Sequence, residues 1–310
     1  DRTALAGNGP VRFRPGELAL RFGDGDGDAD DEQGGSDTAG PLLRLAARAA
    51  PTGFVDVDGD GTPDGVAVRN GELSWWRVHA GEVAPTAAQK PLPLPEDRLR
   101  LIDPAFDVQF AELGGGPRAD LLLTTSGRRG DEVEVRIDRF PGTDDGFGAA
   151  APGRLRLGTL ARAPQLVDVD GDGRLDLVAF TVRTDLLRAV SGGAEPNVEV
   201  QLNVFRNDGT RFVQPSLLAQ RLQVKGARPM RGGPFLTVVP ARAGTPAALL
   251  LRLGDRIVRR PLVRDGDRLQ LEQVVASLAV GDTALLRRVD GHDDRLLVLA
   301  EHELLHVRWR

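Results

Sequence analysis

The chain has 310 residues, a hydrophobic fraction of 41% and a formal net charge of −5. This length suffices for one large all-β domain or two ordinary domains with packed cores. The small negative charge gives no general attraction for nucleic acid, and no apolar run approaches the roughly 18 residues of a membrane-spanning helix. Because cysteine is absent, disulfides and thiolate metal sites are excluded. We therefore expect no nucleic-acid partner and no membrane span.

Short apolar or alternating runs follow one another along the chain and are separated by turn-forming residues. The chain has 38 glycines and 21 prolines, and no long segment has the apolar period of a helix. This pattern predicts many short antiparallel strands. In chain order, the clearest runs are 11–13, 18–22, 42–45, 65–68, 121–123, 177–182, 198–205 and 296–299.

The most acidic segment, Gly23–Glu32, follows the second of these runs. Asp24, Asp26 and Asp28 alternate as calcium ligands do, but Ala29 stands where such a loop needs glycine. No apolar strand follows directly. We interpret the segment as an acidic hairpin loop, and the alternative is a third, weak calcium site at these three carboxylates.

A repeated segment extends over most of the sequence. FVDVDGDGTPDGVAV at 54–68 matches LVDVDGDGRLDLVAF at 166–180, and weaker copies lie at 110–123, 238–251 and 287–300. The motifs start near 56, 112, 168, 239 and 288, so their spacings run from 49 to 71 residues. A four-stranded propeller blade needs roughly 40 to 50 residues, which is close to most of these spacings.

Five repeats of this size predict an all-β fold, a β-propeller of five four-stranded blades in which residues 1–310 form a single domain. Only two strands remain after Arg288, so strands from residues 1–50 are expected to complete the last blade. A ring closed by both chain ends leaves no exposed sheet edge to promote aggregation. We assign the long interval from 168 to 239 to an extended hairpin that turns at Asn207-Asp208-Gly209.

The two full repeats each carry an acidic loop with the spacing of a calcium site. Carboxylates stand at relative positions 1, 3, 5 and 9, and glycine at position 6 permits a sharp turn. Calcium takes six to eight oxygen ligands, and the backbone carbonyl at position 7 can join the set. The predicted ligands are Asp56, Asp58, Asp60, Thr62 and Asp64 in the first loop, and Asp168, Asp170, Asp172, Arg174 and Asp176 in the second.

Other interpretations of these loops fit less well. An EF-hand would need a bidentate Glu at position 12, where Ala67 and Ala179 stand, and its flanks would be helical. Magnesium resists an all-protein cage, and zinc prefers His and Cys. In metal-free Asp-Gly turns, the four close carboxylates would repel one another. We therefore predict two bound calcium ions as structural cofactors.

The sequence contains no recognisable catalytic motif, so we expect that the protein is not an enzyme. His302 and His306 have helical spacing but fall in a strand-like run, and we expect structural roles for them. Adjacent Trp75 and Trp76 in a strand point to opposite faces. One could therefore pack between blades while the other faces outward. We expect core or inter-blade packing, and a sugar-stacking platform is the alternative.

The motifs DVDGDGTPD and DVDGDGRLD, each followed by a strand and recurring at blade spacing, resemble the FG-GAP (VCBS-type) repeats of integrin alpha-chain propellers and many bacterial surface proteins. The resemblance implies a propeller with calcium in its blade loops, held at the eight aspartates named above. It also implies a secreted, periplasmic or cell-surface setting and a role in adhesion or ligand binding. The three weaker copies do not match the ligand positions of the family.

Three functions follow as hypotheses. The first is a monomeric binding module with structural calcium and an unidentified protein or glycan ligand. The second is a carbohydrate-binding propeller lectin, and the third is a propeller-scaffold enzyme that acts on polysaccharide. A ring axis lined with acids, Arg and His would favour the enzyme, whereas Val and Leu there would count against it. The first residue is Asp1 rather than Met, which fits either a removed signal peptide or a chosen boundary.

Overall fold

The computed structural model describes residues 11–13, 53–69, 71–79, 82–84, 88–93, 102–130, 132–144, 146–182, 198–224, 236–242, 244–253, 255–279, 285–288, 295–300 and 303–308. Within these ranges the chain is all-β and contains no helix, which confirms the predicted fold class. Accordingly, no described segment is a helix that could cross a membrane.

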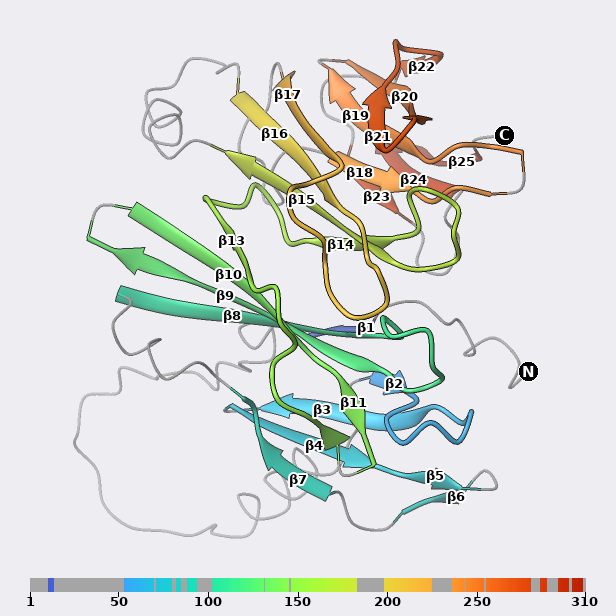
Figure 1. Cartoon of the computed structure of the whole chain (residues 1–310). Coiled ribbons are helices and arrows are strands. Elements are labelled where there is room, and N and C mark those ends of the chain that lie inside the picture. The colour runs from blue at the N-terminus through green and yellow to red at the C-terminus, as the bar shows by residue number, and fades with distance from the viewer. Residues whose placement is uncertain are drawn as a thin grey trace, which may run out of the picture.

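The strands form successive antiparallel sheets, each built mainly from neighbours in sequence (Figure 1). Sheet 1 contains β2 (Gly53–Val55), β3 (Asp64–Arg69), β4 (Glu72–Trp76) and β7 (Ala88–Pro91). Sheet 2 contains β1 (Val11–Phe13), β8 (Ile102–Ala111), β9 (Asp120–Arg129), β10 (Glu132–Phe140) and β13 (Leu155–Leu157). Sheet 3 contains β14 (Gln165–Val167), β15 (Asp176–Val182), β16 (Val198–Phe205) and β17 (Leu218–Val224).

Two further sheets and two short hairpins complete the set. Sheet 4 contains β18 (Leu236–Val239), β19 (Ala248–Leu253), β20 (Arg256–Asp265), β21 (Arg268–Leu271) and β22 (Ala276–Ala279). Sheet 5 contains β23 (Leu285–Arg288), β24 (Arg295–Ala300) and β25 (Glu303–Arg308). The hairpins are β5 (Val78–His79) with β6 (Glu82–Val83), and β11 (Gly142–Thr143) with β12 (Gly146–Phe147).

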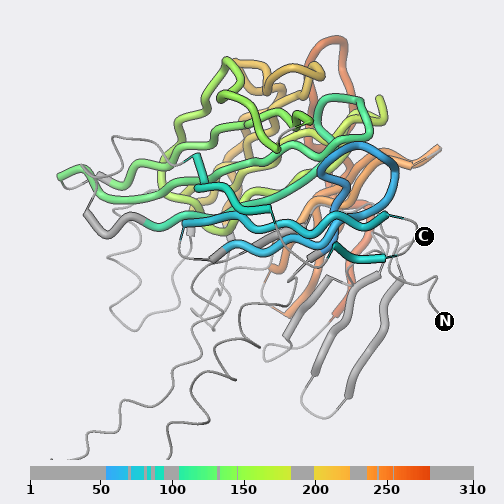
Figure 2. Tube along the Cα trace, turned by 90° about the horizontal axis from the view of Figure 1, so that it is seen from below, coloured from blue at the N-terminus to red at the C-terminus, as the bar shows by residue number. Residues whose placement is uncertain are grey.

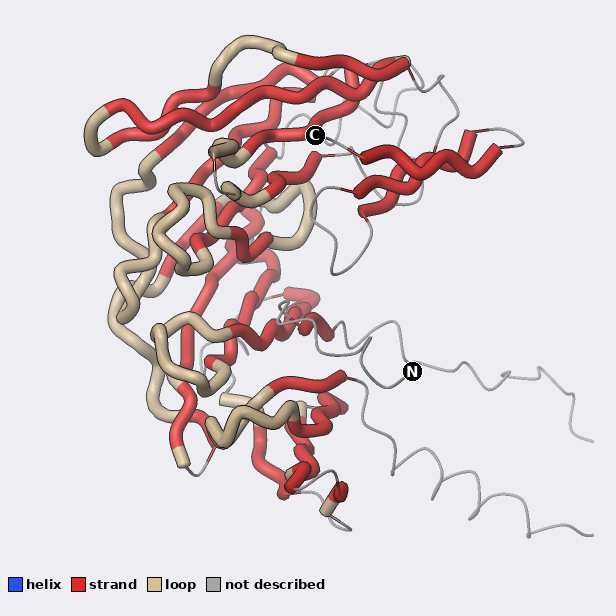
Figure 3. Tube along the Cα trace, turned by 90° about the vertical axis from the view of Figure 1, so that its right-hand side faces the viewer, coloured by secondary structure: helices blue, strands red, loops and turns tan. Residues whose placement is uncertain are grey.

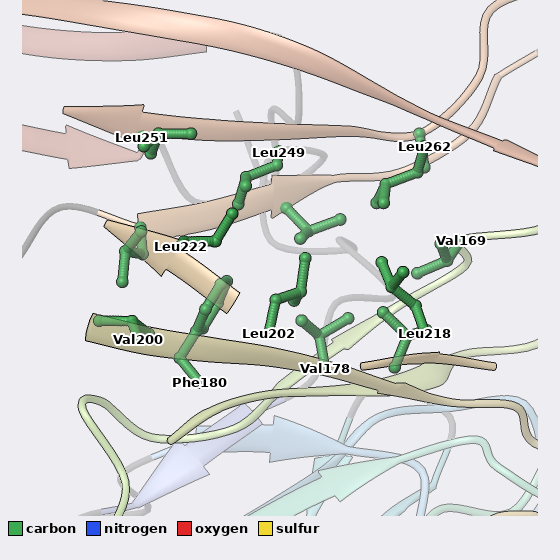
Figure 4. Close-up of a cluster of buried hydrophobic side chains, with 14 of the residues drawn as sticks. Val169, Val178, Phe180, Val200, Leu202, Leu218, Leu222, Leu249, Leu251 and Leu262 are labelled. Carbon is green, nitrogen blue, oxygen red and sulfur yellow. The ribbon is translucent and has the colours of Figure 1, made fainter. Parts of the chain in front are cut away.

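Sheets 1 to 4 pack face to face with their neighbours, and this packing explains the nearly continuous apolar runs of the central strands. In β15, Leu177 belongs to the core between sheets 2 and 3, whereas Val178 and Phe180 belong to the core between sheets 3 and 4 (Figure 4). A strand covered on both faces loses the apolar–polar alternation of a half-exposed strand. A third core, which includes Trp75 and Phe110, lies between sheets 1 and 2. Figures 1 and 2 show sheets 1 to 4 following one another in chain order, and Figure 3 shows the same stack of strands from the side.

The five motif segments have equivalent places in the five sheets. Each lies in the connection between the first and second strands of its own meander, namely β2–β3, β8–β9, β14–β15, β18–β19 and β23–β24. The strand-like runs at 11–13, 65–68, 121–123, 177–182, 198–205 and 296–299 all lie in strands, as predicted. The described sheets do not form a closed ring, so the five-bladed propeller stays a prediction.

The pairing of the first strand differs from the predicted one. Val11–Phe13 is a strand, but Val11 pairs with Phe110 of β8, so β1 extends sheet 2 rather than sheet 5. The reason is that β9 covers only one edge of β8, and the backbone groups of the other edge accept a further strand. The runs 18–22 and 42–45, like the acidic segment 23–32, lie outside the described residues.

Both tryptophans of β4 are buried, which agrees with the expected core or inter-blade packing. Trp75 packs in the core between sheets 1 and 2, as expected for one of them. Trp76 does not face outward, because it is only 8% exposed. Neither side chain can therefore serve as an exposed sugar-stacking platform. Of the two C-terminal histidines, His306 lies in β25, and His302 lies outside the described residues.

The core between sheets 3 and 4 should dominate the stability of the fold. Phe180 is 0% exposed there, and Phe180→Ala should cost about 3–5 kcal/mol and lower the Tm, because it leaves a cavity in packed surroundings. Phe54→Ala makes the same deletion at a side chain that is 47% exposed, and should change stability by about 0.5 kcal/mol or less. Thermal unfolding of both variants checks the difference, and equal Tm losses would contradict this packing.

Candidate metal centre

The first acidic loop, between β2 and β3, winds around the carboxylate of Asp56. Its Oδ1 accepts a hydrogen bond from Gly59 N at 2.6 Å, and its Oδ2 accepts one from Gly61 N at 2.8 Å. The second loop, between β14 and β15, repeats this arrangement. There Asp168 accepts hydrogen bonds from Gly171 N at 2.7 Å and Gly173 N at 3.0 Å. The matching sequences therefore fold into matching loops.

Glycines at positions 4 and 6 permit this winding. Gly59 and Gly61 have φ values of 81° and 84°, and their counterparts Gly171 and Gly173 have 78° and 83°. Side chains disfavour this left-handed region, whereas glycine adopts it readily. The need for glycine at position 6 was predicted from the sequence. The equal need at position 4 was missed, although the repeated Asp-Gly-Asp-Gly pattern contained the signal.

The aspartate at position 9 closes each loop from inside the protein. Asp64 and Asp176 open β3 and β15 and are 1% and 0% exposed. The Oδ2 atom of Asp64 accepts a hydrogen bond from Val57 N at 3.2 Å, and its Oδ1 accepts one from Val78 N at 2.9 Å. Asp176 makes the same two kinds of bond, to Val169 N at 3.1 Å and Asn207 N at 2.9 Å. Each carboxylate thus joins its loop to the end of the third strand.

Positions 1, 3 and 9 meet in each loop. One carboxylate oxygen from each residue lies within 4.8 Å of the others in the sets Asp56, Asp58, Asp64 and Asp168, Asp170, Asp176. Each set can therefore hold a metal ion through carboxylate oxygens. The predicted ligands at position 5 do not belong to these sets. Asp60 Oδ1 accepts a hydrogen bond from Thr62 N at 2.7 Å, and Asp172 Oδ1 accepts one from Arg174 N at 2.8 Å.

The two clusters concentrate negative charge at buried positions. Burial raises the pKa of Asp176 to about 7, despite hydrogen bonds that lower it, and repulsion from Asp170 and Asp172 raises it further. Burial likewise raises the pKa of Asp64, with smaller contributions from Asp58 and Asp56 in the same direction. A nearby cation would favour the charged forms of these carboxylates.

Three basic side chains lie near the acidic loops, but none forms a close ion pair with a carboxylate there. Arg77 Nε lies 3.6 Å from Asp58 Oδ2, and Arg264 Nη1 lies 3.8 Å from Asp170 Oδ2. His79 Nδ1 lies 3.9 Å from Asp60 Oδ2. These three basic side chains are at least half exposed, so the pairs contribute little. Sequence reasoning missed these contacts because the three basic residues lie outside the motifs.

Each loop is also attached to the sheet that follows it. Ala119 N, in the β8–β9 loop of sheet 2, donates to Asp56 O at 2.8 Å. Ala241 N, in the β18–β19 loop of sheet 4, donates in the same way to Asp168 O at 2.9 Å. Arg118 adds a bond from its Nε to Asp58 O at 2.8 Å. Ordering an acidic loop therefore also orders a junction between two sheets.

The chain was compared with protein-family models, with curated proteins and with solved structures. No family model, curated protein or solved structure matches it.

The pKa of Asp176 predicts how the stability of the metal-free protein depends on pH. The pKa of Asp176 is about 7 in the folded protein, whereas the ordinary pKa of an Asp side chain, which applies in the unfolded chain, is 3.8. Because the folded state binds more protons, the stabilising contribution is complete below pH 3.8 and is lost as the pH rises through about 7. The Tm of chelated protein should therefore fall more steeply between about pH 5 and pH 8 in the wild type than in Asp176→Asn.

Thermal unfolding in chelator across this pH range checks the prediction. Asp267→Asn, which changes an exposed aspartate in the β20–β21 turn, is the control and should follow the wild-type profile. Parallel profiles for the wild type and Asp176→Asn would contradict the shifted pKa.

Proposed function

We propose that the protein is a calcium-stabilised β-propeller binding module, secreted, periplasmic or on the cell surface, and not an enzyme. The observation that carries the proposal is the pair of carboxylate clusters with the same geometry at equivalent places in sheets 1 and 3. The resemblance of the two motifs to FG-GAP repeats agrees with it. Calcium is the structural cofactor, and the ligand is an unidentified protein or glycan.

The chemistry of the donor set favours calcium. Both clusters offer carboxylate oxygens, without the His nitrogen or Cys sulfur that zinc prefers. Calcium accepts irregular sets of six to eight oxygens, so the position-5 carboxylates and the position-7 carbonyls of Thr62 and Arg174 can complete its shell. A divalent ion would also offset the repulsion that raises the pKa of Asp64 and Asp176.

The arrangement of the sheets favours a propeller. Five consecutive antiparallel sheets carry the motif segment in the same connection, and neighbouring sheets share cores on their faces. Radial repetition of four-stranded sheets is how propellers build a large all-β domain. The fold by itself does not choose a function, because propellers host many activities.

A binding role follows from what the metal does in this scaffold. The loops hold neighbouring sheets together through Asp56 and Asp168, so calcium would stiffen the scaffold rather than activate a reacting group. A rigid scaffold loses less entropy when it binds a partner. The two buried tryptophans do not supply the exposed platform that the lectin alternative would use.

Calorimetric titration of chelated protein should count two calcium ions. Asp58→Asn and Asp170→Asn should each remove one ion, because position 3 supplies a ligand to each cluster. The exposed control Asp267→Asn should keep both. Because the ligand binds only the folded state, each site should add about 2.7 kcal/mol at 100 times its Kd, and the Tm should rise accordingly. A count of zero in wild-type protein would overturn the calcium assignment.

Binding of a partner can be measured on glycan and protein arrays with calcium-loaded protein. We expect at least one specific ligand, with binding lost in chelator and weakened in the double variant Asp58→Asn, Asp170→Asn. The absence of any ligand, together with turnover of a polysaccharide substrate, would replace this proposal with the enzyme alternative.

A further inference from the structure

The second repeat keeps one buried aspartate from the acidic loops and loses the others. Asp120 opens β9 as Asp64 opens β3, and it is 4% exposed. Its Oδ1 accepts a hydrogen bond from Gly142 N at 2.9 Å. The same bond runs from Val78 N to Asp64 and from Asn207 N to Asp176. The three carboxylates are therefore structurally equivalent.

The other oxygen of Asp120 has a different partner. In the acidic loops, Oδ2 of the equivalent aspartate accepts a hydrogen bond from the second residue of the loop. Asp120 Oδ2 instead accepts a bond from Arg139 Nε at 2.9 Å, and Arg139 Nη2 lies 2.7 Å away. Both side chains are at least nine-tenths buried. A guanidinium thus contacts the carboxylate whose equivalents in sheets 1 and 3 belong to the candidate metal sites.

The loop itself leaves room for this guanidinium. Positions 3 and 5, occupied by aspartate in the acidic loops, are Gly114 and Gly116 here. A Cβ added at Gly114 would lie 3.2 Å from Arg139 Nη2. Position 1 is Glu112, which is exposed. The missing carboxylates are those that a metal would need, and the space at position 3 borders the arginine.

The strand register gives the residues that are equivalent to Arg139 in sheets 1 and 3. Arg139 pairs with Leu122 in sheet 2, and the equivalent pairs are Trp75 with Val66 in sheet 1 and Val204 with Val178 in sheet 3. This position faces the next sheet, because Trp75 and Val204 both lie in cores shared with the following sheet. An apolar residue that packs between sheets is thus replaced by a cation in sheet 2.

Arg139 also reaches sheet 3. Its Nη2 donates to Gly209 O at 2.9 Å, and its Nη1 donates to Asn207 Oδ1 at 3.4 Å. Asn207 in turn donates from Nδ2 to Leu113 O in the loop of the second repeat at 2.8 Å. The guanidinium therefore lies between a loop of sheet 2 and a turn of sheet 3, and bonds to both.

We infer that Arg139 takes the place of a metal ion in the second repeat and fixes the junction between sheets 2 and 3 without metal. A guanidinium is always charged and presents five donors, so one side chain supplies both the charge and the cross-link. The comparison with sheets 1 and 3 rests on the proposed calcium role. The contacts of Arg139 are independent of calcium, so measurements of stability test them separately.

Arg139→Met removes the charge and the donors but keeps much of the length of the side chain. It should lower the Tm by about 5 °C or more, in calcium and in chelator alike, because it leaves Asp120 buried without its cation. Arg211→Met is the matched control in the same turn of sheet 3, where an exposed pair with Asp208 contributes little. Equal Tm values for Arg139→Met and this control would overturn the inference.

A second variant keeps the test valid if Arg139→Met folds poorly. Asp120→Asn combined with Arg139→Met removes both charges, and it should recover at least half of the lost Tm. No recovery would mean that the pair is not the cause of the loss, and the inference would fail.

Hydrogen exchange compares the three loops directly. Chelation should speed amide exchange at 56–64 and 168–176 and leave 112–118 unchanged, because only the last has a built-in cation; Ala119 is left out because its amide bonds to Asp56 O in the first acidic loop. Acceleration in all three loops would overturn the inference. Acceleration in none would overturn the calcium proposal instead, and the Tm of Arg139→Met would still decide the role of the arginine.

A gain of function gives the sharpest result. Combining Glu112→Asp, Gly114→Asp, Gly116→Asp, Pro117→Gly and Arg139→Val rebuilds the acidic loop, with glycine at position 6 and the apolar residue found at the equivalent position 204. If wild-type protein binds two calcium ions, this variant should bind three, whereas the same loop with Arg139 retained should bind two. A third ion in both variants would show that the arginine does not occupy the metal position.

Discussion

A buried carboxylate at the start of the second strand is the constraint on which the motif loops of sheets 1 to 3 depend. Asp64, Asp120 and Asp176 each hold the backbone beyond the third strand of their sheet in the same way. Desolvation makes a buried charge costly unless a partner compensates it. Sheet 2 uses a guanidinium, and we propose that sheets 1 and 3 use calcium.

This constraint links local chemistry to the packing of the whole chain. The loops that surround the carboxylates bond to the following sheet through Asp56 O and Asp168 O. The strand that follows the second loop, β15, is buried on both faces by neighbouring sheets, and β3, which follows the first loop, packs against sheet 2. Charge compensation at a loop therefore stabilises an interface that is otherwise made of Val, Leu and Phe side chains. The polar contacts of the loop and the apolar contacts of the core stabilise the same junction between two sheets.

The sequence predicted the strand content and the acidic loops well, because both depend on short-range patterns. The Asp-Gly alternation specifies which residues turn and which carry carboxylates, and positions 1, 3 and 9 meet as expected. Contacts between distant residues were not predictable in this way. The pairing of Val11 with Phe110 spans nearly a hundred residues, and the contact of Arg139 with Asp120 needs the register of β9 and β10. A lone arginine in a strand carries no local signal of a role in a loop.

The attachments between loops and sheets have a direction. Ala119 donates to the loop before it in the chain, and Ala241 does the same, so each acidic loop is completed by a segment that comes later in the chain. During synthesis, the loop of sheet 1 emerges before the sheet that contacts it, and the loop of sheet 3 must wait for sheet 4. A chain released after sheet 3 would therefore leave the Asp168 carbonyl without its donor.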